Sequence, residues 1–267
     1  MSGNKLYLSN SGIQVFLNCK RKYKFKYINK IKSKQQSPSK YLAFGNSMHM
    51  TLAQFNMLTD KKYRTIDNLH MLLRKNWKRE GYQSLEEERE YGLKALTMLS
   101  NYFDDQKDQG KQNVLIEEMI NKNMDGKFTL CGKLDKVYLR NDGLIETIDY
   151  KTGRNIETFN NMQLPIYILL TKEKLGRYPN IISYYYMAYN KKIEQEVTAE
   201  VIEDALNNLW NIYEKISTEK EFPSNPNTNC KMMCEYYDMC NSAKDSNFIM
   251  TNILENLKNE KRTDTIF

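Results

Sequence analysis

The chain has 267 residues, of which 40% are hydrophobic and 27% charged, and this composition is typical of a globular protein that is long enough to bury a core without disulfides. It contains no run of about 18 apolar residues, so the sequence predicts no membrane span and no membrane partner. The first residues lack the apolar stretch of a signal peptide, and we therefore expect a cytoplasmic protein. Five cysteines in that compartment indicate metal ligation or core packing rather than a disulfide framework.

The net charge of +7 is concentrated near the N-terminus. Residues 1–59 contain ten lysines and arginines and no acidic residue, whereas the remaining 208 residues sum to −3. Nine of those ten cations lie between Lys20 and Lys40. Such a block either binds a polyanion or forms a solvated helical face, and charge alone does not choose between these roles. It favours nucleic acid over an acidic protein as the partner.

Helices are predicted along the first 106 residues. A basic amphipathic helix can begin at Ser9 or Ser11 and run to about Tyr27, and a polar loop covers residues 32–40. From about residue 42 to residue 106 the spacing of apolar residues is helical almost throughout. The period then changes to that of strands, which are predicted at 114–120, 127–132, 134–140 and 144–150.

The second half of the chain alternates the two element types. We expect a helix at about 159–174, a strand at 180–189, a helix at 202–216 and a final helix at about 247–258. This order predicts an α/β fold with helical additions at both ends. The expected organisation is one domain, 1–267, with four parts: a helical part (1–110), an α/β core (111–220), a cysteine loop (221–245) and a C-terminal helix (246–267).

Two aspartates are expected to meet at one end of the sheet. Asp149 ends a predicted strand and Asp135 begins the strand before it, so an antiparallel hairpin through the Asp142-Gly143 turn places them side by side. Two adjacent carboxylates repel each other unless a cation such as magnesium lies between them. Lys151 shares a face with Asp149 because side chains alternate along a strand. These groups suit phosphodiester hydrolysis, in which a metal activates water and a lysine stabilises the developing negative charge.

Each of these residues also has a purely structural interpretation. The hairpin could be exposed to solvent and carry an ordinary cross-strand ion pair. His49 follows a glycine-containing turn, and a lone histidine is more often a core or surface residue than a ligand. Gln163 and Tyr167 are four residues apart and share a helix face, which ordinary packing also explains.

Together, these motifs resemble the RecB-like branch of the PD-(D/E)XK nucleases. The similarity runs in order from about Leu8 to Cys240 and is carried by LSNSGIQVFLNCKRKYKFKYI, FGNSMH, GKLD, DYKTG and QLPIY. It implies a restriction-endonuclease-like core, in which helices flank a mixed central sheet, with N-terminal helical additions and a C-terminal cysteine-rich iron–sulfur segment. The CRISPR adaptation nuclease is a close relative of the same branch and stays open as an alternative.

The resemblance also implies a role for individual residues. A divalent metal, magnesium or manganese, would be held by His49, Asp135, Asp149 and the carbonyl of Tyr150. The catalytic set would be Asp135, Asp149, Lys151, Gln163 and Tyr167. In that set Lys151 is the catalytic lysine, while Gln163 and Tyr167 position it or the DNA. The acidic residue that such nucleases often carry on their first strand would be Glu118 or Glu117, and the sequence does not choose between them.

Four of the five cysteines form a second candidate metal site. Three are close together near the C-terminus and one lies over two hundred residues earlier: Cys19, Cys230, Cys234 and Cys240. Zinc sites usually come as two close pairs, so this pattern is unusual for zinc. The resemblance implies a 4Fe–4S cluster with four thiolate ligands. The first gap within the triplet is three residues where two is usual and Lys20 stands where proline is common, so iron–sulfur and zinc both stay open. Cys131 is expected in the core.

The basic N-terminal helix is the expected DNA contact, because its cations can neutralise phosphates. The residues concerned are Lys20, Arg21, Lys22 and Lys24. Tyr23 and Tyr27 are four apart and are expected to form the buried stripe of this helix. No base-reading motif accompanies them, which fits a nuclease that is indifferent to sequence.

The sequence therefore predicts a metal-dependent DNA nuclease of the exonuclease type. We expect it to act on single-stranded or frayed DNA ends in recombination, repair or related DNA processing. A helicase partner would be a separate chain, because no GxxxxGK[ST] motif occurs in this sequence. The alternative is a catalytically silent module of nuclease fold that binds DNA or a helicase, and Asp135, Asp149 and Lys151 favour catalysis over it.

Overall fold

The computed structural model describes residues 6–33, 39–105, 107–156 and 162–240. The chain divides into two compact units, which are described separately. Unit 1 comprises residues 1–10 and 37–213, and unit 2 comprises residues 11–36 and 214–267. The helix expected at 247–258 lies outside the described residues, and the single-domain organisation stays a prediction.

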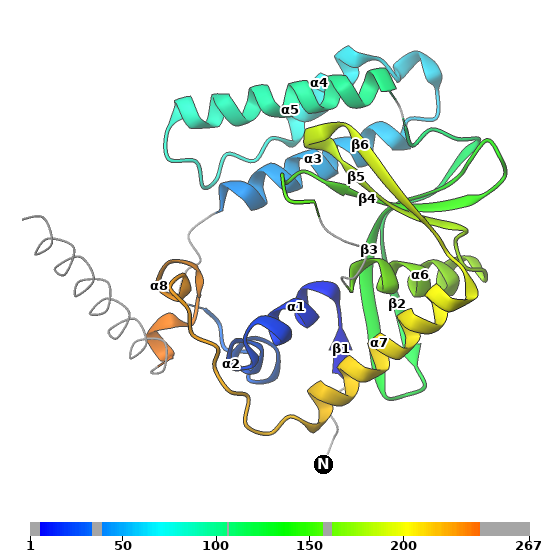
Figure 1. The fold of residues 1–267 in the computed structure, drawn as a ribbon. Coiled ribbons are helices and arrows are strands. Elements are labelled where there is room, and N and C mark those ends of the chain that lie inside the picture. Colours follow the sequence, from blue (N-terminus) through cyan, green and yellow to red (C-terminus); the bar gives the residue numbers. More distant parts are fainter. Residues whose placement is uncertain (1–5, 34–38, 106, 157–161, 241–267) are drawn as a thin grey trace, which may run out of the picture. The chain divides into compact units, whose positions relative to one another are not determined.

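Unit 1 is built on a mixed six-stranded sheet (Figure 1). Its strands are β1 (Leu6–Leu8), β2 (Gln112–Met124), β3 (Phe128–Leu139), β4 (Ile145–Lys151), β5 (Ile181–Tyr186) and β6 (Lys191–Glu196). β3 pairs with β2 and β4 in antiparallel fashion and with β1 in parallel, β4 pairs with β5 in parallel, and β5 pairs with β6 in antiparallel fashion. The mixed sheet expected from the sequence is therefore confirmed.

The strand assignments differ from the sequence predictions at three places. The two strands expected at 127–132 and 134–140 are one continuous strand, β3, because Gly132 and Lys133 at their junction continue to pair with β2. The strand β6 was not predicted because its sequence, KKIEQE, is charged and carries a single apolar residue. The strand β1 was not predicted because it has only three residues.

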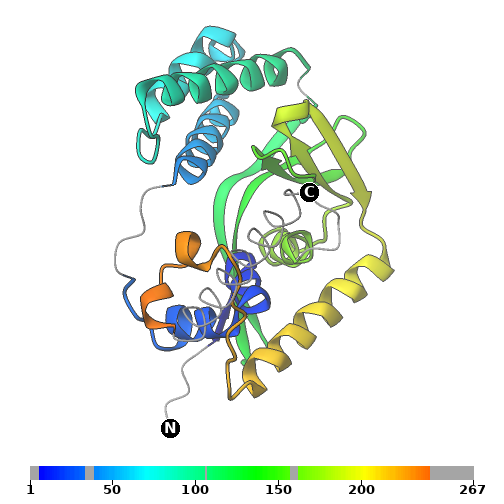
Figure 2. The same ribbon diagram turned by 60° about the vertical axis from the view of Figure 1, so that its left-hand side comes forward.

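Helices cover both faces of this sheet. The helices are α3 (Lys40–Met57), α4 (Ile66–Asn76), α5 (Leu85–Asp105), α6 (Gln163–Leu175) and α7 (Ala199–Thr218), together with the short 3-10 turns η2 (Lys61–Tyr63) and η3 (Met187–Tyr189). α3, α4 and α5 pack on one another in both views (Figures 1 and 2). Adjacent residues of β4 show the two faces, because Asp149 contacts Tyr167 of α6 whereas Tyr150 packs on Tyr102 of α5.

The core of unit 1 joins the helical layer to the sheet. The buried apolar side chains of α3, α4 and α5 form one cluster with Tyr138, Ile148 and Tyr150 of the sheet. On the other face, α6 approaches β3 closely, because a side chain at Gly132 would meet Leu170 at 2.8 Å. Pro165 is the third residue of α6, where its missing N–H costs no helical hydrogen bond.

Unit 2 combines the N-terminal helices with the chain that follows α7. Its elements are α1 (Asn10–Asn18), which begins one residue before the unit, α2 (Lys20–Tyr23), the π-helical turn η1 (Lys24–Ile28), α8 (Cys230–Met233) and the 3-10 turn η4 (Tyr237–Met239). The single helix expected up to Tyr27 is interrupted at Cys19, whose backbone is extended (φ −159°, ψ 105°). Tyr23 is buried as expected, and its ring packs against Phe16 and Tyr27. Tyr27, which was also expected to be buried, is only half-buried.

No helix in the described part of the chain is both long enough and apolar enough to cross a membrane.

Candidate active site

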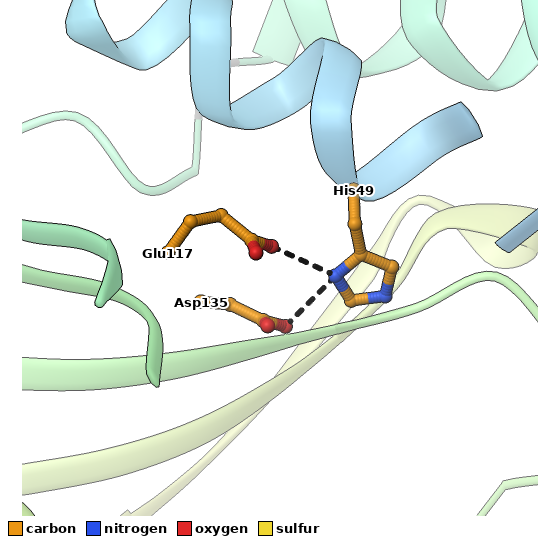
Figure 3. Close-up of side chains that lie close together, drawn as sticks. All are labelled: His49, Glu117 and Asp135. Carbon is orange, nitrogen blue, oxygen red and sulfur yellow. Dashed lines mark ion pairs between the residues drawn. The ribbon is translucent and has the colours of Figure 1, made fainter. Parts of the chain in front are cut away.

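Three potential metal ligands from three different elements of unit 1 converge on one point (Figure 3). His49 Nδ1 of α3 lies 3.3 Å from Asp135 Oδ2 of β3 and 3.6 Å from Glu117 Oε1 of β2. One ligand atom from each of the three lies within 4.8 Å of the others. The expected His49 and Asp135 are therefore brought together, and Glu117 rather than Glu118 is the acidic residue of the first long strand that joins them.

The local backbone explains why Glu117 reaches this site. Ile116 pairs with Lys136 and Glu118 with Leu134, so Glu117 lies opposite Asp135 in the β2–β3 ladder. Glu117 has a φ of +51°, a left-handed conformation that is uncommon for a residue with a side chain and is costly within a strand. Glu118 makes an ion pair with Lys174 of α6 instead. Such strain is characteristic of functional positions, where the surrounding structure holds it in place.

A second group of side chains joins the end of β4 to the start of α6. Lys151 Nζ lies 3.2 Å from Asp149 Oδ2 and donates a hydrogen bond to Gln163 Oε1 at 2.6 Å. Gln163 Nε2 donates to Asp149 Oδ1 at 2.5 Å, and Tyr167 Oη donates to the same oxygen at 3.0 Å. Asp149, Lys151, Gln163 and Tyr167 thus form one connected network. Spacing predicted the pair Asp149 and Lys151 and the pair Gln163 and Tyr167, whereas the link between the pairs was implied only by the family resemblance.

The two groups are adjacent across the β3–β4 hairpin. Lys136 pairs with Ile148, so Asp135 and Asp149 occupy the next position of the ladder, as expected from the turn between these strands. Asp135 Oδ2 also accepts a hydrogen bond of 2.9 Å from the backbone N–H of Tyr150. This bond fixes the orientation of the Asp135 carboxylate relative to β4.

The electrostatics of the site show an excess of carboxylates that attracts positive charge. Burial lowers the pKa of His49, but the carboxylates of Asp135 and Glu117 outweigh burial and raise it to about 10. Burial raises the pKa of Asp149 to about 7, and the negative charge of Asp135 acts in the same direction. Burial also acts to raise the pKa of Glu117, but hydrogen bonds from His49 and Lys133 outweigh it and lower that pKa.

The residues present fit a hard divalent cation. Carboxylate oxygens with one imidazole are suitable ligands for magnesium or manganese. Glu117 Oε2 and Asp149 Oδ2 are buried oxygens, and each lies beside a lysine ammonium group, Lys133 and Lys151 respectively. Both oxygens therefore already attract positive charge, as ligands of a divalent cation would.

The four cysteines expected to bind a metal lie together in unit 2. Cys19, Cys230, Cys234 and Cys240 all line one hollow, and none of them forms a disulfide. Cys131 lies in unit 1, where its thiol donates to Leu8 O at 3.4 Å. The break between α1 and α2 at Cys19 is the feature that a periodicity argument did not predict, since a continuous helix was expected there.

The cations expected to contact DNA make contacts within unit 2. Lys20 pairs with Glu219, and Lys22 lies 2.6 Å from Glu235. Two further contacts involve Phe222: Arg21 Nε donates to its carbonyl oxygen at 2.9 Å, and Lys24 lies over its ring. The role of these four residues in DNA binding stays a prediction.

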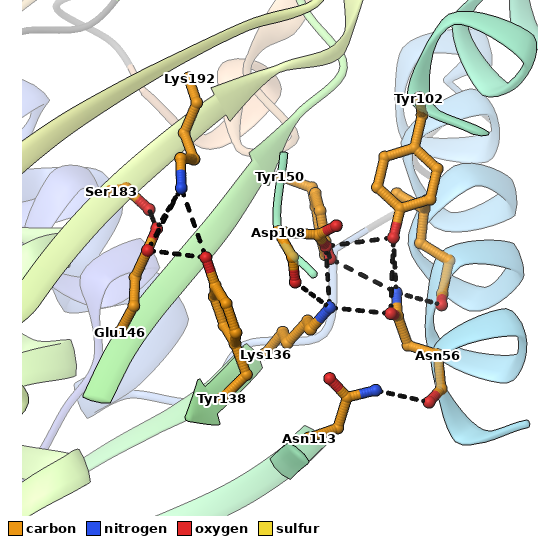
Figure 4. Close-up of polar contacts among 11 residues, drawn as sticks. Asn56, Tyr102, Asp108, Asn113, Lys136, Tyr138, Glu146, Tyr150, Ser183 and Lys192 are labelled. Atoms are coloured by element: carbon orange, nitrogen blue, oxygen red, sulfur yellow. Dashed lines mark hydrogen bonds and ion pairs between the residues drawn. The ribbon is translucent and has the colours of Figure 1, made fainter. Parts of the chain in front are cut away.

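Sequence reasoning missed a buried polar network beside the site (Figure 4). Lys136 is 1% exposed and Asp108 is fully buried, and the two form an ion pair at 3.0 Å. The hydroxyls of Tyr102 and Tyr150 also donate to Asp108. The sequence did not predict the pairing of Asp108, which lies in a loop, with Lys136, which lies in a strand. Their contact depends on tertiary packing.

Comparison with known proteins identifies the family. The model of the PD-(D/E)XK nuclease superfamily matches residues 7–241. The chain therefore belongs to the PD-(D/E)XK nuclease superfamily. A comparison with curated proteins finds no match.

One solved structure agrees with this assignment at the level of the fold. The crystal structure of an inferred exonuclease from Eubacterium rectale is similar with a TM-score of 0.50 and 13% identity, over 91% of this chain and 88% of that chain. A second crystal structure, SSO0001, also has 13% identity, over 91% of this chain and 89% of that chain. Its TM-score of 0.39 is too low to support an argument.

Proposed function

We propose that this protein is a metal-dependent deoxyribonuclease of the exonuclease type that hydrolyses phosphodiester bonds in single-stranded or frayed DNA ends. The observation that carries the proposal is the placement of Lys151 Nζ, 3.2 Å from Asp149 Oδ2 at the end of β4. Beside them, at the next position of the ladder, Asp135 meets His49 and Glu117. A lysine held next to a cluster of carboxylates supplies the positive charge that phosphodiester hydrolysis needs beside the metal ligands.

The proposed metal ligands are His49, Glu117, Asp135, Asp149 and the carbonyl of Tyr150. A magnesium or manganese ion bound there would withdraw charge from the phosphate and lower the pKa of a water molecule. The pairing of His49 with two carboxylates supports this assignment, because the same carboxylates that attract its proton would attract a cation.

The protein itself contributes charge and orientation. The ammonium group of Lys151 stabilises the negative charge that develops on the phosphate as water attacks phosphorus and the bond to the sugar oxygen breaks. Gln163 accepts from Lys151 and donates to Asp149, so it holds the two charged groups in a fixed relation. Tyr167 supports Asp149 from the next turn of α6. Gln163 and Tyr167 are accordingly positioning residues.

The cysteine hollow of unit 2 is the proposed site of a 4Fe–4S cluster. Four thiols are the number that such a cluster requires, and all four line the same hollow. A four-thiolate zinc site is the competing interpretation, and metal analysis separates the two.

Cleavage assays on linear and circular single-stranded DNA test the proposed activity. The account predicts that the linear strand is degraded only when magnesium or manganese is present and that the circle survives. Degradation of both substrates would retain the nuclease but contradict its dependence on ends. No degradation of either, under anaerobic and metal-replete conditions, would contradict the proposed enzyme and favour a DNA-binding module or a helicase partner.

A further inference from the structure

A cleft of unit 1 lies between the end of α3 and the start of β2, the two elements that also carry His49 and Glu117. Its volume is about 610 Å³, which is the size of a typical ligand site. We call this cleft the basic pocket, and the residues that define it here are Asn56, Lys61, Arg64, Lys111, Asn113 and Lys136. Among the described residues that line it, four are cationic, five carry neutral amide or hydroxyl groups, and none is acidic.

The floor of the basic pocket is a connected network of hydrogen bonds (Figure 4). Lys136 Nζ donates to Asn56 Oδ1 at 2.8 Å, to Asp108 O at 2.8 Å and to Asp108 Oδ2 at 3.0 Å. Asn113 Nδ2 donates to the carbonyl oxygen of Asn56 at 2.8 Å, which joins β2 to the end of α3. All three protons of the Lys136 ammonium group are donated in these hydrogen bonds, and the carboxylate of Asp108 balances its positive charge. The floor therefore adds no net charge to the pocket.

The rim, in contrast, carries uncompensated positive charge. Within the described residues, no carboxylate forms an ion pair with Lys61, Arg64 or Lys111, whereas the neighbouring Lys62 pairs with Asp60 at 3.0 Å. The guanidinium of Arg64 lies 4.9 Å from the centre of the Phe55 ring, which holds it beside the cleft. Three unpaired cations around a cleft without acidic lining residues create a local positive potential that attracts anions.

The backbone fixes one of these cations in place. A side chain at Gly110 would meet Leu139 O at 2.2 Å, so only glycine allows the loop to lie against β3 here. The next residue, Lys111, donates its backbone N–H to the same carbonyl oxygen at 2.8 Å. The loop therefore fixes the backbone of Lys111, a residue that lines the basic pocket.

Position along α3 relates the basic pocket to the metal ligands. His49 and Asn56 are seven residues apart on α3, so they share a helix face and are separated by about 10 Å along its axis. At about 3.4 Å of rise per nucleotide in a duplex strand, this span corresponds to roughly two to four nucleotides. His49 contacts β2 at Glu117 and Asn56 contacts β2 at Asn113, so α3 and β2 run together from one site to the other.

We propose that the basic pocket binds a backbone phosphate of the nucleic-acid strand, two to four nucleotides from the bond that is cut. The inference rests on the proposed function, because it assigns a subsite for the same substrate. Lys61, Arg64 and Lys111 neutralise the phosphate without reading bases. The side-chain amides of Gln109 and Gln112, which also line the pocket, can donate neutral hydrogen bonds to it.

Binding of a labelled single-stranded oligonucleotide over a series of salt concentrations tests the proposal. All proteins carry Lys151→Ala, which prevents cleavage, and the compared variants are Arg64→Gln, Lys111→Gln and their double substitution. Lys127→Gln is the matched control, because Lys127 is an exposed lysine at the turn of the same β2–β3 hairpin. Each pocket variant should reduce the slope of log affinity against log salt by about 0.7, and the double variant should weaken binding roughly tenfold. The control should change neither quantity.

A second experiment measures cleavage by protein that retains Lys151, and it locates the bound phosphate along the strand. Substrates carry one uncharged methylphosphonate linkage at successive distances from the cut. The proposal predicts slower cleavage when that linkage lies two to four nucleotides from the bond that is cut. In the double variant, the same linkage should not slow cleavage any further, because the contact is already lost. Excess inorganic phosphate should compete only weakly, since a strand presents several phosphates at once.

The outcomes separate the two proposals. If the pocket variants bind and cleave as the control does, the basic pocket proposal is overturned while the nuclease stands. If the unmodified protein cleaves nothing, the proposed function fails, but the binding arm still decides whether the pocket holds a strand. Effective competition by inorganic phosphate alone, with unchanged oligonucleotide slopes, would overturn the assignment to a strand.

Discussion

The ammonium group of Lys151 donates a hydrogen bond of 2.6 Å to Gln163 Oε1. This contact joins the last residue of β4 to the first residue of α6, and it fixes the side-chain amide of Gln163 in one orientation. The amide nitrogen consequently faces Asp149, to which it donates at 2.5 Å. Gln163 is thus placed to hold a cation and a carboxylate at the distance that the proposed reaction needs.

Substitution Gln163→Leu should lower kcat by about 10- to 100-fold while KM changes little, because a positioning group acts on the transition state rather than on substrate binding. Gln163→Glu keeps an acceptor for Lys151 but replaces the donor to Asp149 with a second carboxylate, and the two carboxylates repel each other, so its loss should be at least as large. Steady-state kinetics on a linear substrate measure both variants. Gln195→Leu, on the edge strand β6, is the control, and an equal loss in that variant would contradict a positioning role.

Glu117 and Glu118 offer a matched pair for testing metal ligation. Glu117→Gln should weaken manganese binding by at least about 10- to 100-fold, because it removes one ligand of the cluster. Glu118→Gln should bind manganese like the unmodified protein, since Glu118 pairs with Lys174 instead. Manganese titration followed by electron paramagnetic resonance measures the affinity directly. Equal effects of the two substitutions would contradict the assignment of Glu117.

Asp108 should be a major determinant of stability. Asp108→Asn leaves Lys136 buried without its counter-charge, and the expected loss is about 3–5 kcal/mol in the free energy of unfolding. Urea unfolding measures this loss, and Asp104→Asn, an exposed acid on α5, should stay within about 0.5 kcal/mol. A loss that small for Asp108→Asn would contradict the importance of the buried pair.

The same residue predicts how stability depends on pH. Burial acts to raise the pKa of Asp108, but Lys136 and the hydroxyl of Tyr150 outweigh burial and lower it. A lowered carboxyl pKa stabilises the folded state above the pKa of the unfolded chain, about 4, and this contribution is lost as the pH falls through the lowered value. Unfolding of Asp108→Asn should therefore depend less on pH below about 4 than unfolding of the unmodified protein.

Two cysteine substitutions separate the metal site of unit 2 from Cys131, a half-buried thiol in unit 1 that was expected in the core. Cys240→Ser should lose most of the bound iron and the visible absorbance of a cluster, because it removes one of four thiols that line the hollow. Cys131→Ser should retain both, since Cys131 contacts the Leu8 backbone in unit 1. Metal analysis of anaerobically purified protein decides the matter. Zinc in place of iron would contradict the proposed cluster, and unchanged metal in Cys240→Ser would contradict the site itself.

The sequence was sufficient for the parts of the site that depend on local periodicity. The hairpin turn and the period of two placed Asp135, Asp149 and Lys151 together, and helical spacing placed Gln163 beside Tyr167. The choice between Glu117 and Glu118 could not be made in this way. It depends on the left-handed backbone at Glu117, which no propensity of glutamate predicts.

Contacts between segments that are distant in the chain could not be predicted from the sequence either, because they depend on tertiary packing. The pairing of Lys136 with Asp108 arises because packing of α3 and α5 on the sheet buries both groups together. The short strand β1 gains its stability from pairing with β3, since three residues carry almost no strand signal of their own. Cys19 interrupts a segment whose apolar spacing favours one helix, so its position at the hollow follows from tertiary structure.

The most direct test of the proposed mechanism compares Lys151→Ala with Lys127→Ala in parallel cleavage and binding assays on linear single-stranded DNA with magnesium or manganese. Lys127 is exposed at the turn between β2 and β3 and lies outside the described contacts of the site. The account predicts that Lys151→Ala loses cleavage by at least about 100-fold and keeps its affinity for DNA, while Lys127→Ala cleaves normally. Normal cleavage by Lys151→Ala, or an equal loss of cleavage and binding, would contradict the role assigned to Lys151.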